Sequence, residues 1–326
     1  MTQHQANQYC TSFCDVMNRI LFILIFLFGT SLFSQDYERI DATILLYPTH
    51  CETPEELSKF ITRDFFTEEE KVRAIYSWMI QNIAYEPKEY KKFDYRFSNI
   101  RERNEKEEVT RQKIINRTLQ KGTAVCEGYA FLFEKLCELQ GITNYLVRGD
   151  TKTTIEGIGE EYTTSHVWNV ALINGKPYLF DPTWGAGKYQ QKFIKGPNYF
   201  YYKTAPELFI KTHYPELFED AFFSEKFTKK EFSDLPLIID SKMLISDIIT
   251  PKKGVIFTEV YFDEIQFEIK NANPNLVSYS YNNQKNEILK LTQNNSVLKF
   301  SVPLELEAKK ILIYFDDLPV LGYLIK

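Results

Sequence analysis

The sequence predicts an α+β protein in two parts: a domain of helices and strands, followed by an all-β domain. Three observations lead to this prediction. Capped segments with apolar residues at helical spacing occur before about residue 140. Alternating segments joined by a tight turn follow, up to about residue 181. From about residue 235, short alternating runs with turn residues between them predict a β-sandwich.

The composition is that of globular domains, and the charge gives no reason to expect a nucleic-acid partner. The chain has 326 residues, of which 44% are hydrophobic and 15% aromatic, too apolar for a disordered chain. A chain of this length suggests two domains. The net charge is -5 and no basic tract stands out, so we expect no nucleic-acid partner.

Residues 1–35 are expected to be a signal peptide region. Arg19 precedes an apolar run over residues 20–28, and small residues follow before a candidate cleavage site after Ser34. The run is short for a bilayer-spanning helix, although an uncleaved anchor is the alternative. Met17 is a second candidate start of the chain. We therefore expect an exported protein, periplasmic or extracellular, with no stable membrane span once the signal is removed.

The first domain is predicted to span residues 36–225 and to begin with helices. Residues 52–86 are expected to be mostly helical, because Thr53 and Thr67 each precede an acidic first turn, which is the pattern of an N-cap. The charge-rich stretch at residues 88–113 is predicted to be a solvated loop or helix face.

A further helix is predicted to begin at Cys126, with Gly122 before it and Gly141 after it. The unpaired amides and the dipole at a helix start favour a thiolate. Position alone leaves Cys126 open as a core thiol, half of a disulfide, a metal ligand or a nucleophile. The predicted buried stripe of this helix consists of Tyr129, Leu132, Phe133, Leu136 and either Leu139 or Gln140.

The cysteine count narrows these alternatives. Removal of the signal region leaves Cys51, Cys126 and Cys137, an odd number in a compartment where cysteines usually pair. Cys126 and Cys137 lie roughly 16 Å apart along one helix, too far for a disulfide. We expect Cys137 to be a small core hydrophobe. The sparse cysteines and few histidines argue against a zinc site, and we expect neither a metal nor a cofactor.

A β-hairpin is predicted at Asn174-Gly175, because a two-residue type I′ turn needs positive φ at both positions. In that register Trp168 faces Asp181 and His166 faces Thr183, which makes His166 a diagonal neighbour of Asp181. A carboxylate there can hold one imidazole nitrogen and leave the other for a thiol. A three-residue loop would change the pairing, and a core histidine near a strand-end aspartate is the structural alternative. The face shared with His166 is predicted to carry Trp168, Val170, Leu172, Leu179, Asp181 and Thr183.

The second domain is predicted to span residues 235–326. Its alternating runs include "GVIFTEVYFDEIQFEIK", "SVLKFSVPLE" and "KKILIYFDD", each bounded by turn residues. Alternation with a period of two places apolar side chains on one face of each strand, as a sandwich requires.

Three segments together resemble the transglutaminase-like superfamily, most closely its kyphoscoliosis peptidase-like branch. They are "AIYSWMIQNIAYE", "GTAVCEGYAFLFEKLCELQGI" and "SHVWNVALINGKPYLFDPTWG", and the resemblance covers roughly residues 60–220. Thr212-His213-Tyr214-Pro215 also suggests this branch. The resemblance implies a papain-like transglutaminase core, here followed by the C-terminal all-β sandwich-like domain. Ala124 and Glu86 depart from the glycine and aspartate that are frequent at their positions.

By this resemblance, Cys126 would be the nucleophile, His166 the general base and then acid, and Asp181 the residue that orients the histidine. The implied reaction is acyl transfer on an amide bond of a protein or peptide. A thioester on Cys126 would be resolved by water or by an amine. The backbone N–H of Cys126 is the expected first oxyanion donor. Trp78 and Gln81 are candidates for the second.

The resemblance leaves the outcome of the reaction open. A protease or amidase releases the acyl group to water, whereas a transglutaminase transfers it to an amine. A catalytically inactive binding or scaffolding module is the alternative from another class. Trp184 would line a substrate groove or pack structurally. No segment matches a D-x-D-x-D-G calcium loop.

Overall fold

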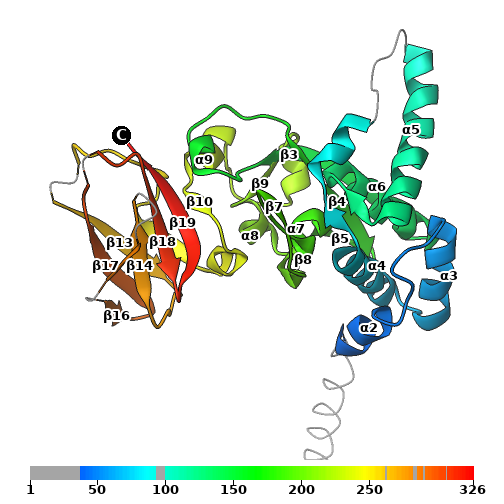
Figure 1. The fold of residues 1–326 in the computed structure, drawn as a ribbon, viewed down its shortest axis with the longest axis horizontal. Helices are drawn as coiled ribbons and strands as arrows, with labels where there is room; N and C mark the ends of the chain where they lie inside the picture. The colour runs from blue at the N-terminus through cyan, green and yellow to red at the C-terminus, as the bar shows by residue number, and fades with distance from the viewer. Residues whose placement is uncertain (1–36, 93–99, 261–262, 282–284, 289–290, 306) are drawn as a thin grey trace, which may run out of the picture. The chain divides into compact units, whose positions relative to one another are not determined.

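The structure is a computed structural model that describes residues 37–92, 100–260, 263–281, 285–288, 291–305 and 307–326 (Figure 1). The predicted signal region lies outside these residues. Met1–Leu46 and Tyr47–Lys326 form two separate compact units. Of the first unit the structure describes one short helix, α2 (Tyr37–Ile44). Among all the residues described, no helix has both the length and the apolar character needed to cross a membrane.

Helices α3 (Pro54–Asp64) and α4 (Glu68–Asn82) confirm the predicted helical start of the domain. The Thr53 side chain accepts a hydrogen bond from the backbone N–H of Glu56, and Thr67 forms a capping box with Glu70. Every residue of α4 from 72 to 80 is buried. This helix is therefore covered on all sides over two turns.

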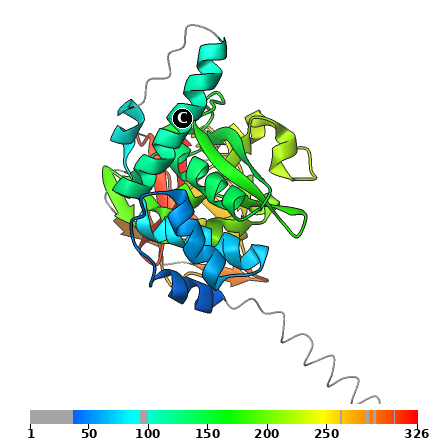
Figure 2. The ribbon, with the colours of Figure 1, turned by 90° about the vertical axis from the view of Figure 1, so that its right-hand side faces the viewer.

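The charge-rich stretch contains the 3-10 helix η1 (Pro87–Lys92) and the long helix α5 (Ile100–Lys121). Ile115 and Leu119, near the end of α5, are buried, and this helix packs on α6 (Cys126–Leu139). Helix α6 also contacts α3 and α4, and it contacts strands β3 (Asn144–Thr151) and β4 (His166–Ile173) (Figures 1 and 2). Helix α6 therefore joins the helical layer to the main sheet.

The residues that flank α6 behave as predicted. Gly122 and Gly141 have φ values of 61° and 73°, in the left-handed region that favours glycine. The helix begins at Cys126, as expected from the sequence. Tyr129, Leu132, Phe133 and Leu136 are fully buried, whereas Leu139 and Gln140 are partly exposed.

The main sheet has five antiparallel strands in the order β8-β5-β4-β3-β9. Its central strand, β4, is buried at every residue except Leu172, so both of its faces are covered. The sheet thus places the start of β4 inside the domain rather than at its surface. The remaining strands of this sheet are β5 (Lys176–Phe180), β8 (Tyr202–Thr204) and β9 (His213–Pro215).

The predicted hairpin register is confirmed. Asn174 and Gly175 have φ values of 51° and 74°, and Ile173 pairs with Lys176. The pairing ends at Phe180. The hairpin therefore delivers the chain to Asp181 beside the start of β4.

Two facing pairs that extend beyond Phe180 are wrong. Asp181 does not face Trp168 in the sheet, because it is the N-cap of α7 (Pro182–Ala186). Thr183 lies within α7 and does not pair with His166. Proline cannot donate to a strand ladder and suits the first turn of a helix, so the chain turns away from the sheet at Pro182. His166 pairs with Gly149 of β3 on its other side.

The C-terminal region has two sheets around one core, in agreement with the predicted sandwich-like domain. One sheet has the order β10-β19-β18-β14-β15, with β12 also on β19, and the other has the order β11-β13-β17-β16. Phe267 and Phe300 are paired across β13 and β17, and their rings stack at 4.9 Å. They share the core with Ile313 and Leu321 of the other sheet. The strands are β10 (Leu237–Ile238), β11 (Asp247–Thr250), β12 (Val255–Ile256), β13 (Glu264–Lys270), β14 (Val277–Ser280), β15 (Lys285–Glu287), β16 (Thr292–Asn294), β17 (Val297–Pro303), β18 (Lys310–Phe315) and β19 (Leu318–Ile325).

The segment between the two predicted domains is tied to both. Lys152 is buried, and its Nζ donates to the backbone oxygens of Phe232 and Ser233 at 2.7 and 3.0 Å. Ile155 packs with Leu237 in a small apolar cluster. The domain limits at residues 225 and 235 stay a prediction. The elements not yet named are β1 (Ala84–Tyr85), β2 (Thr123–Ala124), η2 (Ile155–Gly157), β6 (Gly187–Gln190), β7 (Lys192–Lys195), η3 (Tyr199–Tyr201), α8 (Pro206–Phe209), η4 (Phe218–Ala221), α9 (Lys229–Asp234) and η5 (Ser241–Ile245).

Gly149 gives a test of this packing. A Cβ atom at this position would lie 2.3 Å from the ring of Trp168 and 2.3 Å from the backbone oxygen of Tyr214. We expect Gly149→Ala to lower the free energy of unfolding by about 1–3 kcal/mol, because overpacking forces neighbours out of place. Denaturant unfolding measures the change. Gly196→Ala is the control, since nothing lies within 4 Å of its Cβ position. Equal stability of the two variants would contradict the prediction.

Candidate active site

Cys126 is the first residue of α6, and its side chain is partly exposed. Cys51 and Cys137 are buried, and all three of these cysteines are free thiols. Burial, with a contribution from the charge of Glu56, raises the pKa of Cys51 to about 11, and burial raises the pKa of Cys137 as well. The expectation that Cys137 is a core residue is confirmed. Of these three thiols, Cys126 alone has access to solvent.

The structure brings His166 and Asp181 together. His166 Nε2 lies 2.7 Å from Asp181 Oδ2, and both residues are buried. Cys126 lies near the ring of His166, since it is among the groups that raise the pKa of this histidine. The three residues expected to form the site therefore lie in one contiguous group, although they come from α6, β4 and the start of α7.

Asp181 has a second, structural role at the same time. Its Oδ1 accepts hydrogen bonds from the backbone N–H groups of Thr183 and Trp184 at 2.8 and 3.0 Å. This is the N-cap of α7, and Pro182 occupies the first turn. The helix cap fixes the carboxylate, and its other oxygen is left to face His166.

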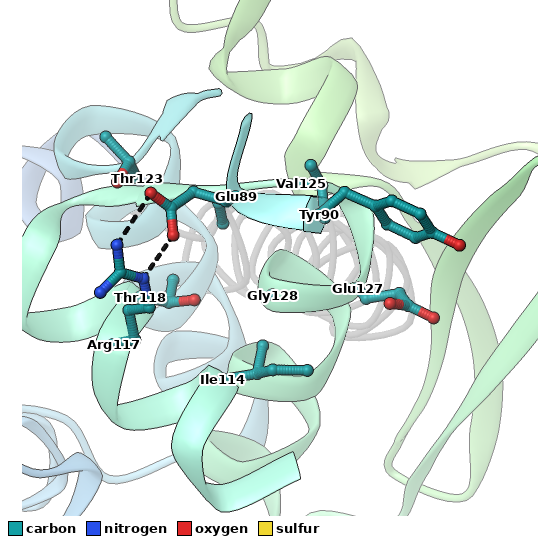
Figure 3. A pocket seen from close by; sticks show the side chains of 10 residues that line it. Glu89, Tyr90, Ile114, Arg117, Thr118, Thr123, Val125, Glu127 and Gly128 are labelled. Carbon is teal, nitrogen blue, oxygen red and sulfur yellow. Dashed lines mark hydrogen bonds and ion pairs between the residues drawn. The ribbon is translucent and has the colours of Figure 1, made fainter. Parts of the chain in front are cut away.

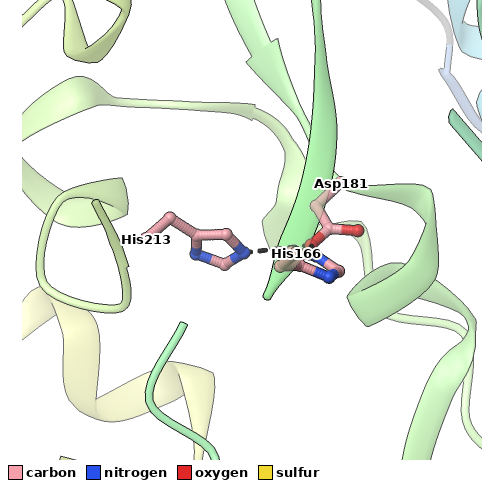
Figure 4. Close-up of side chains that lie close together, drawn as sticks. All are labelled: His166, Asp181 and His213. Atoms are coloured by element: carbon pink, nitrogen blue, oxygen red, sulfur yellow. Dashed lines mark hydrogen bonds and ion pairs between the residues drawn. The ribbon is translucent and has the colours of Figure 1, made fainter. Parts of the chain in front are cut away.

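A second histidine, His213, belongs to this group and was not predicted as a site residue (Figure 4). Its Nε2 lies 2.9 Å from Asp181 Oδ2, the same oxygen that contacts His166. His213 is fully buried at the start of β9. In the sequence analysis, Thr212–Pro215 only supported the family resemblance. The histidine in this segment was the one sequence feature that could have suggested a further site residue.

The charges of this group favour distinct protonation states. Burial disfavours the imidazolium of His166, but the charge and hydrogen bond of Asp181, with Cys126, outweigh burial and raise its pKa to about 10. Burial would raise the pKa of Asp181, yet the two histidines hold it well below its usual range. Burial lowers the pKa of His213 to about 4, against the attraction of Asp181. At neutral pH these shifts give a charged His166, an ionised Asp181 and a neutral His213.

Aromatic rings surround the two histidines. Trp184 lies 4.6 Å from His213 and 6.3 Å from His166, measured between ring centroids. Phe209 stacks on His213 at 4.0 Å, and Trp168 lies edge-on to it at 5.3 Å. Trp184 packs on both histidines and is partly exposed, and its place in a substrate groove stays a prediction. This apolar wall weakens screening by water and strengthens the interactions within the group.

The two candidates for the second oxyanion donor, Trp78 and Gln81, have different surroundings in the structure. Trp78 is buried and its Nε1 donates to the backbone oxygen of Pro48 at 2.8 Å, so it packs in the core and is already engaged. Gln81 is partly buried near the end of α4. Tyr85 lies near Cys126, since burial and then the charge of Cys126 raise the pKa of its phenol.

The two departures from the family pattern have local explanations. Ala124 is buried in β2, where it pairs with Tyr85 of β1. The Glu86 carboxylate accepts a hydrogen bond from the backbone N–H of Lys88 at 3.0 Å, at the start of η1. Neither residue contacts Asp181 in the hydrogen bonds described. Their roles are in the strand pair and the loop that precede α6.

A small cavity lies next to the start of α6 (Figure 3). Glu89 and Arg117 form a two-point ion pair within it, one contact of which, Arg117 Nη2 to Glu89 Oε1, is 3.1 Å long. Val125, Glu127 and Gly128 line it on the α6 side, whereas Cys126 does not. The cavity therefore flanks the cysteine without containing it.

Among the residues described, His166, Asp181 and His213 are a group whose ligand atoms lie close enough together for a metal ion, within 4.8 Å of one another. In this arrangement both histidine Nε2 atoms are at hydrogen-bonding distance from one carboxylate oxygen. A proton on each Nε2 atom makes both contacts hydrogen bonds, without a metal ion. The expectation of no metal was based on the cysteine spacing and the few histidines in the sequence, and it stays a prediction.

The cysteine at the start of α6, the histidine at the start of β4 and the aspartate at the N-cap of α7 are the three residues that the resemblance to the transglutaminase-like superfamily implies. Residues 55–205 match the family described as "Transglutaminase-like domain". This range contains Cys126, His166 and Asp181, whereas His213 lies beyond it. The match supports the resemblance to the transglutaminase-like superfamily over this part of the chain.

Two curated relatives carry the name kyphoscoliosis peptidase. The protein from Homo sapiens is 29% identical over 192 residues, which is 56% of this chain and 26% of that protein. The protein from Mus musculus is 29% identical over 164 residues, which is 49% of this chain and 22% of that protein. The chain therefore spans about a quarter of the length of these relatives. A solved structure described as "Crystal structure of a TGase" is 13% identical and covers 57% of this chain and 44% of its own, with a TM-score of 0.29.

The lowered pKa of His213 predicts a loss of stability in acid. Because the folded protein favours the neutral ring, its contribution is complete above the unfolded pKa of about 6.5 and is lost as the pH falls toward about 4. We expect the wild-type free energy of unfolding to fall by about 2 kcal/mol more than that of His213→Gln between pH 6.5 and 4.5. Denaturant unfolding at both pH values measures this. An equal change in the free energy of unfolding of the wild type and of His213→Gln would contradict the prediction.

Proposed function

We propose that this protein is a cysteine-dependent acyl-transfer enzyme that acts on amide bonds of proteins or peptides. The observation that carries the proposal is the contiguous group formed by Cys126, His166 and Asp181. In this proposal Cys126 is the nucleophile, His166 the acid and base, and Asp181 the residue that orients the imidazole. The partial exposure of Cys126 supports access for a substrate.

The first half of the reaction forms a thioester. The His166 imidazolium stabilises the Cys126 thiolate, which attacks the carbonyl carbon of the amide. The carbonyl π electrons move to the oxygen, and the backbone N–H of Cys126 donates a hydrogen bond to this oxyanion. As the intermediate collapses, the C–N bond breaks and His166 gives its proton to the leaving amine. The products are an acyl-enzyme thioester, a free amine and a neutral His166.

The second half releases the acyl group. Neutral His166 removes a proton from water or from an incoming amine, which attacks the thioester carbon. Breaking the C–S bond returns the sulfur as a thiolate beside the imidazolium. Water gives a carboxylic acid, whereas an amine gives a new amide. Asp181 stays ionised throughout and holds the Nε2 proton of His166.

Peptide bonds are the favoured substrate class, since the curated relatives are named peptidases. Export to the periplasm or the extracellular space is part of the proposal and is supported by the apolar run near the N-terminus, outside the described residues. The partner is then a protein or peptide substrate in that compartment.

Alkylation tests the nucleophile. An ordinary cysteine is only about 0.3% thiolate at pH 6, so a thiolate paired with an imidazolium reacts far faster there. We expect iodoacetamide at pH 6 to modify Cys126 at least about tenfold faster than Cys137, as followed by peptide mass spectrometry. In denaturant the two should react alike. Equal native rates would remove Cys126 as the nucleophile.

A product assay distinguishes hydrolysis, cross-linking and a binding role without turnover. A complex peptide mixture incubated with the mature protein and a labelled primary amine reports new termini for hydrolysis and amine incorporation for cross-linking. The Cys126→Ala variant is the matched control. A reactive Cys126 that yields neither product would favour a binding module over an enzyme.

Asp181→Asn tests the orienting carboxylate. Asparagine can still cap α7, but its amide nitrogen cannot accept the Nε2 proton of His166. We expect a folded variant whose Cys126 alkylation at pH 6 falls by about 10²-fold, and whose turnover falls by about 10³–10⁴-fold. Adding His166→Ala should cost little more, because the residues act as a unit.

The control for this variant is Asp150→Asn. Asp150 is another carboxylate of the domain, and it accepts hydrogen bonds from Thr151 N and Ser165 Oγ, away from His166. Its variant should keep the reactivity of Cys126. A stable Asp181→Asn protein with wild-type reactivity would leave only Cys126 and His166 in the mechanism.

A further inference from the structure

His213 is placed to hold Asp181 from the side opposite α7. The Asp181 carboxylate accepts four hydrogen bonds in all. Figure 4 shows the two histidines beside it. Two backbone N–H groups bind Oδ1, and the two histidines bind Oδ2. With His213 in place, Oδ2 has no lone pair left for another donor. The carboxylate therefore cannot rotate without breaking a buried hydrogen bond.

The tautomer of His213 follows from its two neighbours. Its Nε2 faces a carboxylate oxygen, so that nitrogen must carry a proton. Because the ring is neutral, Nδ1 is then an acceptor, and the Thr212 hydroxyl lies 2.8 Å from it. The Thr212 hydroxyl has one proton and two acceptors within reach, the backbone oxygen of Phe209 at 3.3 Å and Nδ1 at 2.8 Å, and the shorter distance favours Nδ1. Thr212 in this way selects the tautomer of His213 that donates to Asp181.

The sheet explains how His213 reaches a residue so distant in sequence. His213 pairs with Thr151 of β3, and His166 pairs with Gly149 of the same strand. Residues 149 and 151 point to one face of the sheet, so both histidines lie on that face. Both rings turn toward Asp181 there, and their centroids lie 5.7 Å apart. Because Gly149 has no side chain, the ring of Trp168 fits against it and lies edge-on to His213.

We propose that His213 is a positioning residue that, with Thr212, locks the Asp181 carboxylate and through it the tautomer of His166. This inference rests on the proposed function of Cys126 and His166, and it adds two residues to that site. His213 does not touch the reacting atoms. Its effect on the thiol passes through Asp181.

The groups that face His213 are few. Asp181 and His166 are the charged groups, and Tyr201 of η3 lies 6.0 Å away between ring centroids. The other described contacts are the Thr212 hydroxyl and the rings of Phe209, Trp168 and Trp184. No described carboxylate other than Asp181 hydrogen-bonds to the ring. The orientation of His213 is thus set by Asp181 and Thr212.

Paired variants test the positioning role. His213→Phe fills the stacked site without a donor, whereas His213→Gln keeps an N–H donor near the Nε2 position. Thr212→Val removes the hydroxyl proton at constant shape, whereas Thr212→Ser keeps it. Measurements are the melting temperature, the rate of Cys126 alkylation at pH 6, and histidine ring ¹⁵N NMR to assign tautomers.

We expect His213→Phe and Thr212→Val to lower the Cys126 alkylation rate at least about tenfold at pH 6. The conservative variants should recover most of the rate at a similar melting temperature. In the wild type the His213 ring should be neutral and protonated at Nε2. In Thr212→Val that preference should weaken. A purely structural role would lower melting temperatures without this pattern of rescue.

Several results would overturn the inference. A fast wild-type Cys126 with an equally fast His213→Phe would remove His213 and leave the proposed function standing. A slow wild-type Cys126 would remove the proposed function, and the positioning role with it. Zinc bound at one equivalent to the purified wild type, but not to His213→Gln, would instead identify the three residues as a metal site.

Discussion

The site depends on one buried carboxylate. Asp181 is fully buried, and an ionised group in such a place is stable only when its hydrogen bonds and charge are satisfied. Here the start of α7 supplies two N–H donors and the two histidines supply two more. The same contacts that make the charge tolerable also join α7, β4 and β9. Removing the carboxylate would therefore affect both the fold and the chemistry.

The precision of the group comes from rigid elements. Cys126 lies at the start of α6, which packs against four helices and three strands, and His166 lies on the central strand of the sheet. Neither depends on a loop for its position, and side chains on such elements hold a geometry better than those on loops. Proline at position 182 turns the chain into α7 directly after Asp181. At the N-cap of this short helix, the carboxylate faces His166 on β4, the strand that pairs with the β5 strand that the chain has just left.

Burial and charge divide the two histidines into different states although they share one oxygen. Burial disfavours the charged ring of His166, but Asp181, with a smaller contribution from Cys126, raises its pKa and keeps the ring protonated. His213 has Asp181 alone as an acidic partner and is enclosed by aromatic rings, so it stays neutral. Two imidazolium rings 5.7 Å apart in an apolar site would repel each other. One charged and one neutral ring is the arrangement that a single carboxylate can satisfy.

Local signals in the sequence determined the caps at Thr53 and Thr67, the start of α6 at Cys126 and the Asn174-Gly175 turn. Each of these depends on a few adjacent residues, so the pattern is readable without tertiary contacts. The hairpin turn was also enough to bring His166 near Asp181, although the predicted facing of Asp181 and Trp168 was wrong. Pro182 ends the strand, and the helix cap rather than the sheet directs the carboxylate.

The tertiary structure alone decided that His213 joins the group. No pattern near His213 in the sequence predicts a contact with Asp181. The contact exists because β9 pairs with β3, which pairs with β4. It also needs the missing side chain of Gly149, whose Cβ position is occupied by Trp168 and Tyr214. Sheet order is a product of packing over the whole domain, whereas caps and turns follow from neighbouring residues. For this reason the sequence could predict Cys126, His166 and Asp181 as candidate site residues, whereas only the fold places His213 beside Asp181.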